Sequence, residues 1–139
     1  MTSLNNYQEQ VREAILRRDG AALMNATITP KSASNRLVVR FQTATFINVV
    51  NSNAQASWIL RDAGTSAVAT RVVAAVQVDL LQHLIVYETT AGSTAATTFF
   101  VRVGAQSGGG GTVEINGSGG SQKFAGTSFS TLEIFEFTP

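Results

Sequence analysis

The chain has 139 residues, of which 44% are hydrophobic, so one domain can bury a core, and it has no cysteine to form disulfides. The formal net charge is +1 and the arginines are scattered from Arg12 to Arg102, which argues against a concentrated surface for nucleic acid. No run approaches the roughly 20 apolar residues that cross a bilayer, and the first residues lack a signal-peptide pattern. We expect a product of the cytoplasm with no membrane insertion and no nucleic-acid partner.

Residues 3–18 are the only stretch with helical spacing. Asn6 followed by Glu9 resembles a capping box, and Gly20 stands where a helix C-cap belongs. A helix this short is marginal in water, so its apolar stripe needs a surface to pack on. This surface can belong either to the chain's own domain or to another protein, and the sequence does not decide between the two. The stripe consists of Tyr7, Val11, Ala14 and Ile15.

After Gly20 the chain changes to short apolar runs, rich in β-branched residues and divided by turn residues. The glycine tracts at residues 108–111 and 117–120 are predicted loop tips. This spacing favours an all-β fold, a single jelly roll or a related Greek-key β-sandwich over residues 21–139, preceded by a short N-terminal α-helix within residues 1–20. Strands are predicted at residues 22–29, 36–46, 55–62, 67–73, 76–88, 97–106, 112–116 and 130–137.

Two of these strands are apolar on both faces. In residues 130–137, Leu132 and Ile134 point to one side, while Phe135 and Phe137 point to the other. A strand of this kind needs a cover on each face, and identical neighbouring chains are one source of cover. In residues 76–88, one face carries Val78, Leu80, Leu84 and Val86, and the other carries Leu81, Ile85 and Tyr87. We therefore predict a homotrimer whose interface contains Leu81, Ile85, Tyr87, Phe135 and Phe137.

His83, the only histidine, is the first candidate for chemistry. Asp79 lies four residues earlier on the same strand face, an arrangement that resembles a base with its orienting carboxylate. Leu81 and Ile85 share that face, however, so a histidine satisfied by packing at an interface is the preferred interpretation. One histidine without cysteine does not build a zinc site of the usual His and Cys ligands.

The remaining candidates also favour structural roles. Glu133 and Glu136 fall on opposite faces of one strand, which does not suit a glycosidase pair. Trp58 lies in a core-like run and is expected to pack rather than to stack on a sugar. The glycine tracts match neither phosphate-binding pattern. We therefore predict no enzyme activity, no catalytic, cofactor-binding or metal-binding residues, and no cofactor.

Several segments, taken in order, resemble a known family. The similarity spans residues 22–137, and it lies in Ile28 to Leu37 (ITPKSASNRL), Trp58 to Asp62 (WILRD), Thr90 to Thr94 (TAGST), Thr97 to Arg102 (TTFFVR), Thr112 to Gly117 (TVEING) and Ser130 to Phe137 (STLEIFEF). This set resembles phage and prophage virion structural proteins with jelly-roll heads of the tumour-necrosis-factor and complement type. The resemblance implies trimers and no catalytic residues. Residues 3–20 depart from the family, whose lead-in is usually extended and contains proline.

The resemblance leaves two classes of function. The first is a virion structural protein, a trimeric knob that acts as a capsid decoration protein or short fibre. It would attach to capsid or tail proteins through a helical segment at residues 1–20 that presents Tyr7, Val11 and Ile15. The second is the receptor-binding head of a tail fibre, which would contact host glycan or protein through loops around Asn51, Gly92 and residues 108–120. An enzymatic alternative, such as a polysaccharide hydrolase, would need carboxylates that converge from different strands.

Overall fold

The computed structural model describes residues 21–47, 54–64, 66–74, 80–105, 113–118, 121–122 and 130–139. Within these ranges the chain is all-β and no residue is helical, so the predicted helix at residues 3–18 lies outside the described residues. The strands are β1 (Ala21–Ile28), β2 (Arg36–Ile47), β3 (Ala54–Arg61), β4 (Ala67–Ala74), β5 (Leu80–Thr90), β6 (Thr97–Ala105), β7 (Val113–Ile115), β8 (Gly117–Ser118), β9 (Ser121–Gln122) and β10 (Thr131–Phe137).

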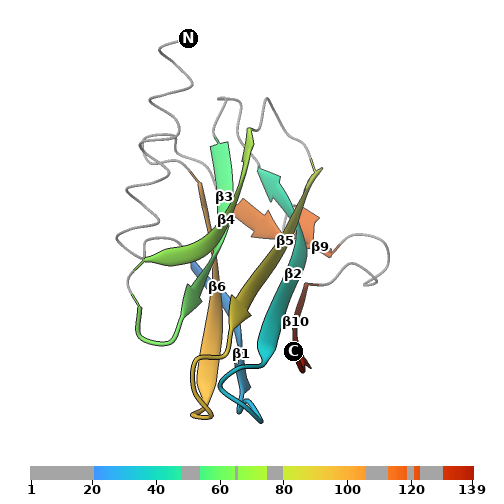
Figure 1. The fold of residues 1–139 in the computed structure, drawn as a ribbon. Helices are drawn as coiled ribbons and strands as arrows, with labels where there is room; N and C mark the ends of the chain where they lie inside the picture. Colours follow the sequence, from blue (N-terminus) through green and yellow to red (C-terminus); the bar gives the residue numbers. More distant parts are fainter. Residues whose placement is uncertain are drawn as a thin grey trace.

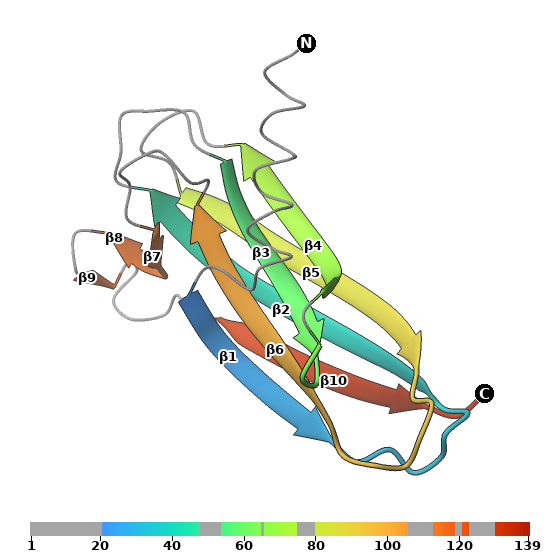
Figure 2. The same cartoon turned by 90° about the vertical axis from the view of Figure 1, so that its left-hand side faces the viewer.

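The main strands form two antiparallel sheets that face each other (Figures 1 and 2). One sheet has the order β1-β6-β3-β4, and the other has the order β10-β2-β5, with β7 paired to the far end of β2. Strand β4 contacts β5 along one side of the two layers, and β1 contacts β10 along the other. The small β8-β9 pair forms a sheet of its own. The predicted β-sandwich class is therefore confirmed.

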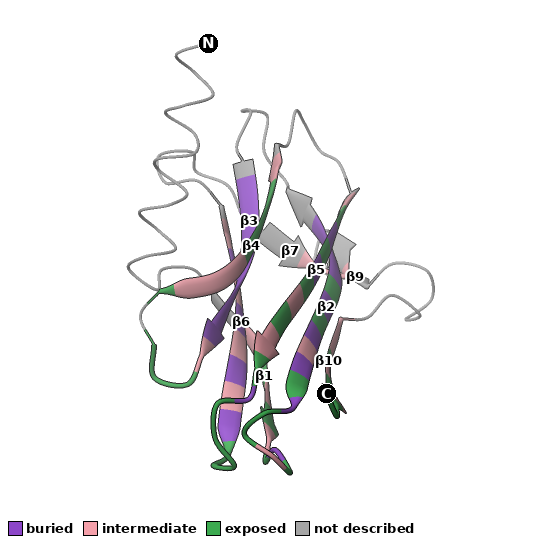
Figure 3. Cartoon of the chain, in the orientation of Figure 1, coloured by how far each residue is buried: buried purple, intermediate pink, exposed green. Residues whose placement is uncertain are grey.

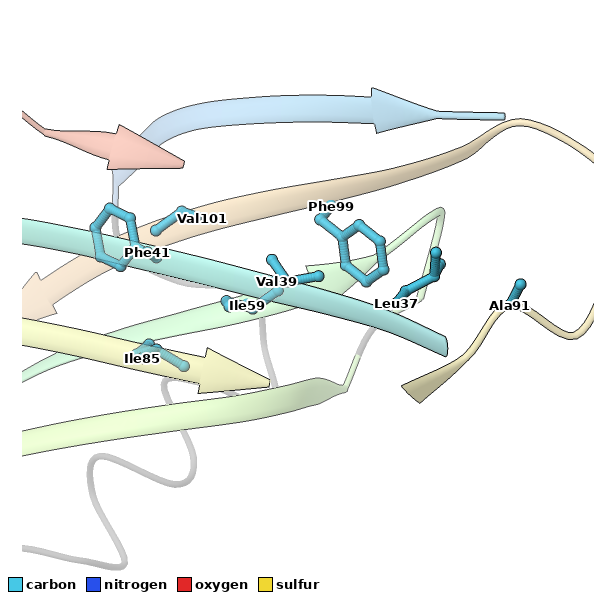
Figure 4. Packing of buried hydrophobic residues seen from close by; sticks show 8 residues of the cluster. All are labelled: Leu37, Val39, Phe41, Ile59, Ile85, Ala91, Phe99 and Val101. Carbon is cyan, nitrogen blue, oxygen red and sulfur yellow. The ribbon is translucent and has the colours of Figure 1, made fainter. Parts of the chain in front are cut away.

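The core lies between the two sheets and follows the alternation that the sequence predicts. Leu37, Val39 and Phe41 of β2 are fully buried, and they meet Phe99 and Val101 of β6 (Figure 4). Successive side chains of a strand point to opposite faces. The buried residues of β2 and β6 therefore occupy alternate positions, on the face of each strand that points between the sheets. Ile59 of β3 and Ile85 of β5 belong to the same cluster.

One end of the sandwich is tied together by hydrogen bonds between its loops and the last strand. The Ala91 amide donates to the Asn35 carbonyl at 2.8 Å, which joins loop 91–96 to loop 29–35. The Glu136 carboxylate accepts from the Lys31 amide and from Asn35 Nδ2, each at 2.7 Å. These bonds favour the ionised carboxylate, and the Asn35 side chain contributes most to lowering the pKa of Glu136. Strand β10 is thus fixed at its C-terminal end.

Candidate oligomer interface

The outer face of the β10-β2-β5 sheet carries large apolar side chains that the chain itself does not cover. Burial alternates along β2 and β5, so every second side chain of these strands points away from the core (Figure 3). On a soluble monomer, apolar residues grouped in this way are unusual and mark interaction surfaces. Four residues, named here the apolar patch, have exposed fractions of 52%, 58%, 43% and 44%: Leu84, Val86, Phe135 and Phe137.

The strand register places the members of the apolar patch in two pairs, Leu84 with Val86 on β5 and Phe135 with Phe137 on β10, on either side of β2. Phe135 of β10 lies opposite Val38 of β2, and the Phe135 and Phe137 rings stack with their centroids 6.5 Å apart. Leu84 and Val86 follow along β5, where Val86 lies opposite Arg40. Of the β2 side chains between the two pairs, Val38 extends the apolar surface from Phe135, whereas Gln42 and Arg40 lie opposite Leu84 and Val86. The face therefore combines two apolar pairs with polar side chains.

Charges on the same face are balanced. Arg40 and Glu133 form an ion pair with 3.8 Å between nitrogen and oxygen, and Arg36 and Glu88 form another at 3.7 Å. The Arg36 guanidinium also lies 5.1 Å from the centre of the Phe137 ring. Exposed pairs of this kind add little to stability, and these two contribute equal numbers of positive and negative charges to the face. A second copy of the face would therefore not be repelled.

Three residues assigned to the interface from sequence lie on the other side of β5, and this assignment is corrected. Ile85 is 5% exposed and belongs to the core, and Tyr87 packs edge-on against Phe99 with ring centroids 6.5 Å apart. Leu81 is half-buried on the same inward face. The register sets this direction, because Ile85 lies opposite the buried Phe41. Phe135 and Phe137 do point outward, and their place in a trimer interface stays a prediction.

His83 lies in a polar cluster inside the sandwich. Its Nε2 is 3.0 Å from Thr45 Oγ1, and its Nδ1 is 2.9 Å from Ser57 Oγ. The Thr45 hydroxyl donates to Gln55 Oε1, so it accepts from His83 Nε2–H, and Nδ1 accepts from the Ser57 hydroxyl. His83 is 1% exposed, and its two partners Thr45 and Ser57 are fully buried, as is Gln55, which accepts from Thr45. The cluster thus bonds β5 to both neighbouring strands, β2 in its own sheet and β3 in the facing sheet.

This environment determines the charge of His83. Burial, followed by the positive charge of Arg71, lowers the pKa of His83 to about 4. The imidazole is therefore neutral near pH 7. Both His83 and its partner Ser57 are enclosed between the sheets. Asp79, the carboxylate expected beside His83, lies outside the described residues.

The other sequence candidates are also placed. Glu133 faces outward beside Arg40, whereas Glu136 binds Lys31 and Asn35, so the two carboxylates serve separate contacts. Trp58 is 1% exposed and packs with apolar neighbours. Among the described residues no three His, Asp or Glu side chains gather as metal ligands.

The predicted attachment residues Tyr7, Val11 and Ile15 lie outside the described ranges, as do Asn51 and residues 106–112. Gly92 lies in the exposed loop 91–96 with φ of 78°, a value that favours glycine. In the part of the chain that the structure describes, no helix is long and apolar enough to span a membrane. A scan against protein-family models finds no matching family, and a search of curated proteins finds no match.

Proposed function

We propose that the chain is a phage virion structural protein, a homotrimeric surface knob that acts as a capsid decoration protein or short fibre. The observation that carries this proposal is the apolar patch on the outer face of the β10-β2-β5 sheet, with exposed fractions between 43% and 58%. A second copy of the same chain is the proposed occupant. The proposed role is structural and binding, and it includes no catalytic step.

The strand order supports a jelly roll as the form of this knob. The chain passes from one sheet to the other between β1 and β2, β2 and β3, β4 and β5, and β5 and β6. Only β3 and β4 are neighbours both in sequence and in a sheet among the strands of the two main layers. Repeated crossings of this kind are typical of Greek-key and jelly-roll sandwiches.

The balance of charges on the outer face favours a copy of the same chain as the partner over a strongly acidic or strongly basic protein. The outer face pairs Arg36 with Glu88 and Arg40 with Glu133, so it offers both signs in equal number around the apolar patch. When copies associate in a ring, each contributes apolar area and brings charges of both signs to the rim. A closed three-fold ring would cover the patch on every copy.

Light scattering after size exclusion tests the trimer. The wild-type chain is expected at three times the chain mass at micromolar concentration. A variant with Phe135→Asp and Phe137→Asp is expected at the mass of one chain, because a trimer would bury two added carboxylates. A control with Ser93→Asp and Ser66→Asp adds the same charge at exposed positions outside the β10-β2-β5 sheet and should stay trimeric. A monomeric wild type, or a trimeric patch variant, would refute the proposal.

The alternative, a receptor-binding head that contacts host glycan or protein, is favoured by the loops at the tied end. Residues 92–96 are exposed, yet hydrogen bonds from Ala91 and Gly92 to loop 29–35 hold the loop's start in place. A fixed, exposed loop is a suitable contact surface. Purified protein mixed with phage particles and with host cells separates the two functions. Decoration predicts binding to particles that lack the protein, and receptor binding predicts attachment to cells.

A further inference from the structure

In the other sheet, β1-β6-β3-β4, the outward side chains of strand β3 are apolar and buried, although Val72, which lies opposite Ala56 on β4, is 43% exposed. In β3, Ile59 points into the core and Ser57 bonds to His83, so the alternate residues point away from the core. These alternate residues, named here the Trp58 face, are nevertheless only 3%, 1% and 0% exposed (Figure 3): Ala56, Trp58 and Leu60.

The described residues do not account for this burial. Trp58 lies between Arg102 of β6 and Thr70 of β4, which flank it within the sheet. Phe100 and Ala67 pack against the same cluster, also from neighbouring strands. Neighbours in a sheet cover the sides of a side chain and leave its outer end open. On the opposite sheet, the outward Leu84 of β5 is 52% exposed. The outer ends of Ala56, Trp58 and Leu60 therefore need a cover that the sheet itself does not supply.

We propose that residues 3–18 of the same chain form an amphipathic helix that packs its stripe of Tyr7, Val11 and Ile15 on the Trp58 face. The stripe is apolar on one side and requires a surface. A helix of this length spans about 24 Å at about 1.5 Å per residue. Strand β3 spans about 26 Å at about 3.3 Å per residue. The helix and the face therefore match in length.

Chain continuity brings this segment to the correct place. Strand β1 begins at Ala21, and Ala22 lies opposite Arg102, which itself lies opposite Trp58. Two strand spacings of about 4.8 Å separate the start of β1 from Trp58, so the preceding residues begin within about 10 Å of it. Each of the other segments outside the described ranges has seven residues or fewer. Residues 106–112 contain no large apolar side chain.

This inference assigns the stripe to the chain's own domain and not to another virion protein. It is independent of the proposed trimer, because the Trp58 face and the apolar patch lie on opposite sheets. A monomeric chain could still bury Trp58 under its own N-terminal segment, and a trimer could form without this contact. A negative result in the light-scattering test of the trimer would therefore leave this inference standing. A negative result in the test described next would likewise leave the trimer proposal standing.

The test uses the full chain, which has no cysteine and a single tryptophan. A bimane label on Ile15→Cys reports contact with Trp58, because tryptophan quenches bimane on contact. We expect weak emission from this chain and recovery when Trp58→Phe is added. Leu16→Cys is the matched control, because residue 16 lies about 100° further round the helix and off the stripe. Its emission should not depend on Trp58. Far-ultraviolet circular dichroism checks that each chain is folded.

Three results would overturn the inference. The first is emission from the residue 15 label that does not change with Trp58→Phe. The second is equal dependence on Trp58 at positions 15 and 16, which would indicate contact without an oriented stripe. In the third, labelled Trp58→Phe chains are quenched only after unlabelled wild-type chains are mixed in, which would place the stripe on a second copy. A second readout is the emission of Trp58 itself, which Ile15→Asp should shift to longer wavelength while Leu16→Asp does not.

Discussion

The buried histidine is expected to make folding stability depend on pH. The pKa of His83 falls from 6.5 to about 4 in the folded chain, chiefly because burial disfavours the charged imidazole. The unfolded chain therefore binds a proton below about pH 6.5, whereas the folded chain binds it only near pH 4. The stability that the folded chain gains by keeping His83 neutral is fully present above pH 6.5, and it is lost as the pH falls toward 4. At about 1.4 kcal/mol per pH unit, the total is about 3 kcal/mol.

The variant His83→Gln isolates this effect, because glutamine keeps polar atoms near Thr45 and Ser57 but does not titrate. Urea unfolding at constant protein concentration, repeated between pH 7.5 and 4.5, gives the free energy of unfolding of both chains. The wild type should lose about 2.5 kcal/mol more than the variant across this range. Glu136 and the other carboxylates are present in both chains, so their titration cancels in the difference. A difference that does not change with pH would refute the reasoning.

Two further predictions concern the core and the tied end. Phe99→Ala should lower the free energy of unfolding by about 3–5 kcal/mol in urea, because the fully buried ring leaves a cavity beside Tyr87, while Val72→Ala at a 43% exposed position should cost far less. An equal loss in both would contradict the assigned core. Asn35→Ala should raise the pKa of Glu136 toward its ordinary value in a carboxyl titration by nuclear magnetic resonance, since Asn35 Nδ2 makes the dominant bond, and Ser34→Ala should not.

Local alternation predicts much of this fold. Leu37, Val39 and Phe41 recur at every second position, so the buried face of the first half of β2 could be read directly, and the same holds for Phe99, Val101 and Val103 in β6. In the second half of β2 the inward positions are Thr43 and Thr45, which this reading does not predict. The alternation in residues 130–137 predicts a strand, and its pair Leu132 and Ile134 packs against the core. Where one face of a strand is apolar and the other polar, the residues of the strand alone show which face points to the core.

Strand β5 shows where this reading fails. Its two faces are both apolar, so the pattern gives the pairs Leu84 with Val86 and Ile85 with Tyr87 but does not say which pair points inward. The direction is fixed by pairing with β2, where Ile85 lies opposite Phe41. The assignment of Leu81, Ile85 and Tyr87 to an interface overlooks that their face points inward and that Ile85 lies in the core, because pairing partners are not visible in a single strand.

Long-range contacts were missed for the same reason. Thr45 and Ser57 are 38 and 26 residues from the histidine they bind, and nothing in a Ser- and Thr-rich sequence distinguishes them from other hydroxyls. Glu136 was considered only as a member of a carboxylate pair, although its partner Asn35 lies 101 residues earlier. One signal was available, because a lone histidine between Leu81 and Ile85 in an apolar strand needs polar partners when it is buried.

The two outward faces of this sandwich differ in a way that links the proposals. Both carry large apolar side chains, but Trp58 is 1% exposed while Phe137 is 44% exposed. A soluble chain that covered one face and left the other open would still expose a surface suited to association. If the N-terminal segment covers the first face, the second is left for neighbouring copies. Contact between copies would then be confined to the β10-β2-β5 sheet, so aspartates at Phe135 and Phe137 should release monomers in which the Trp58 face remains covered.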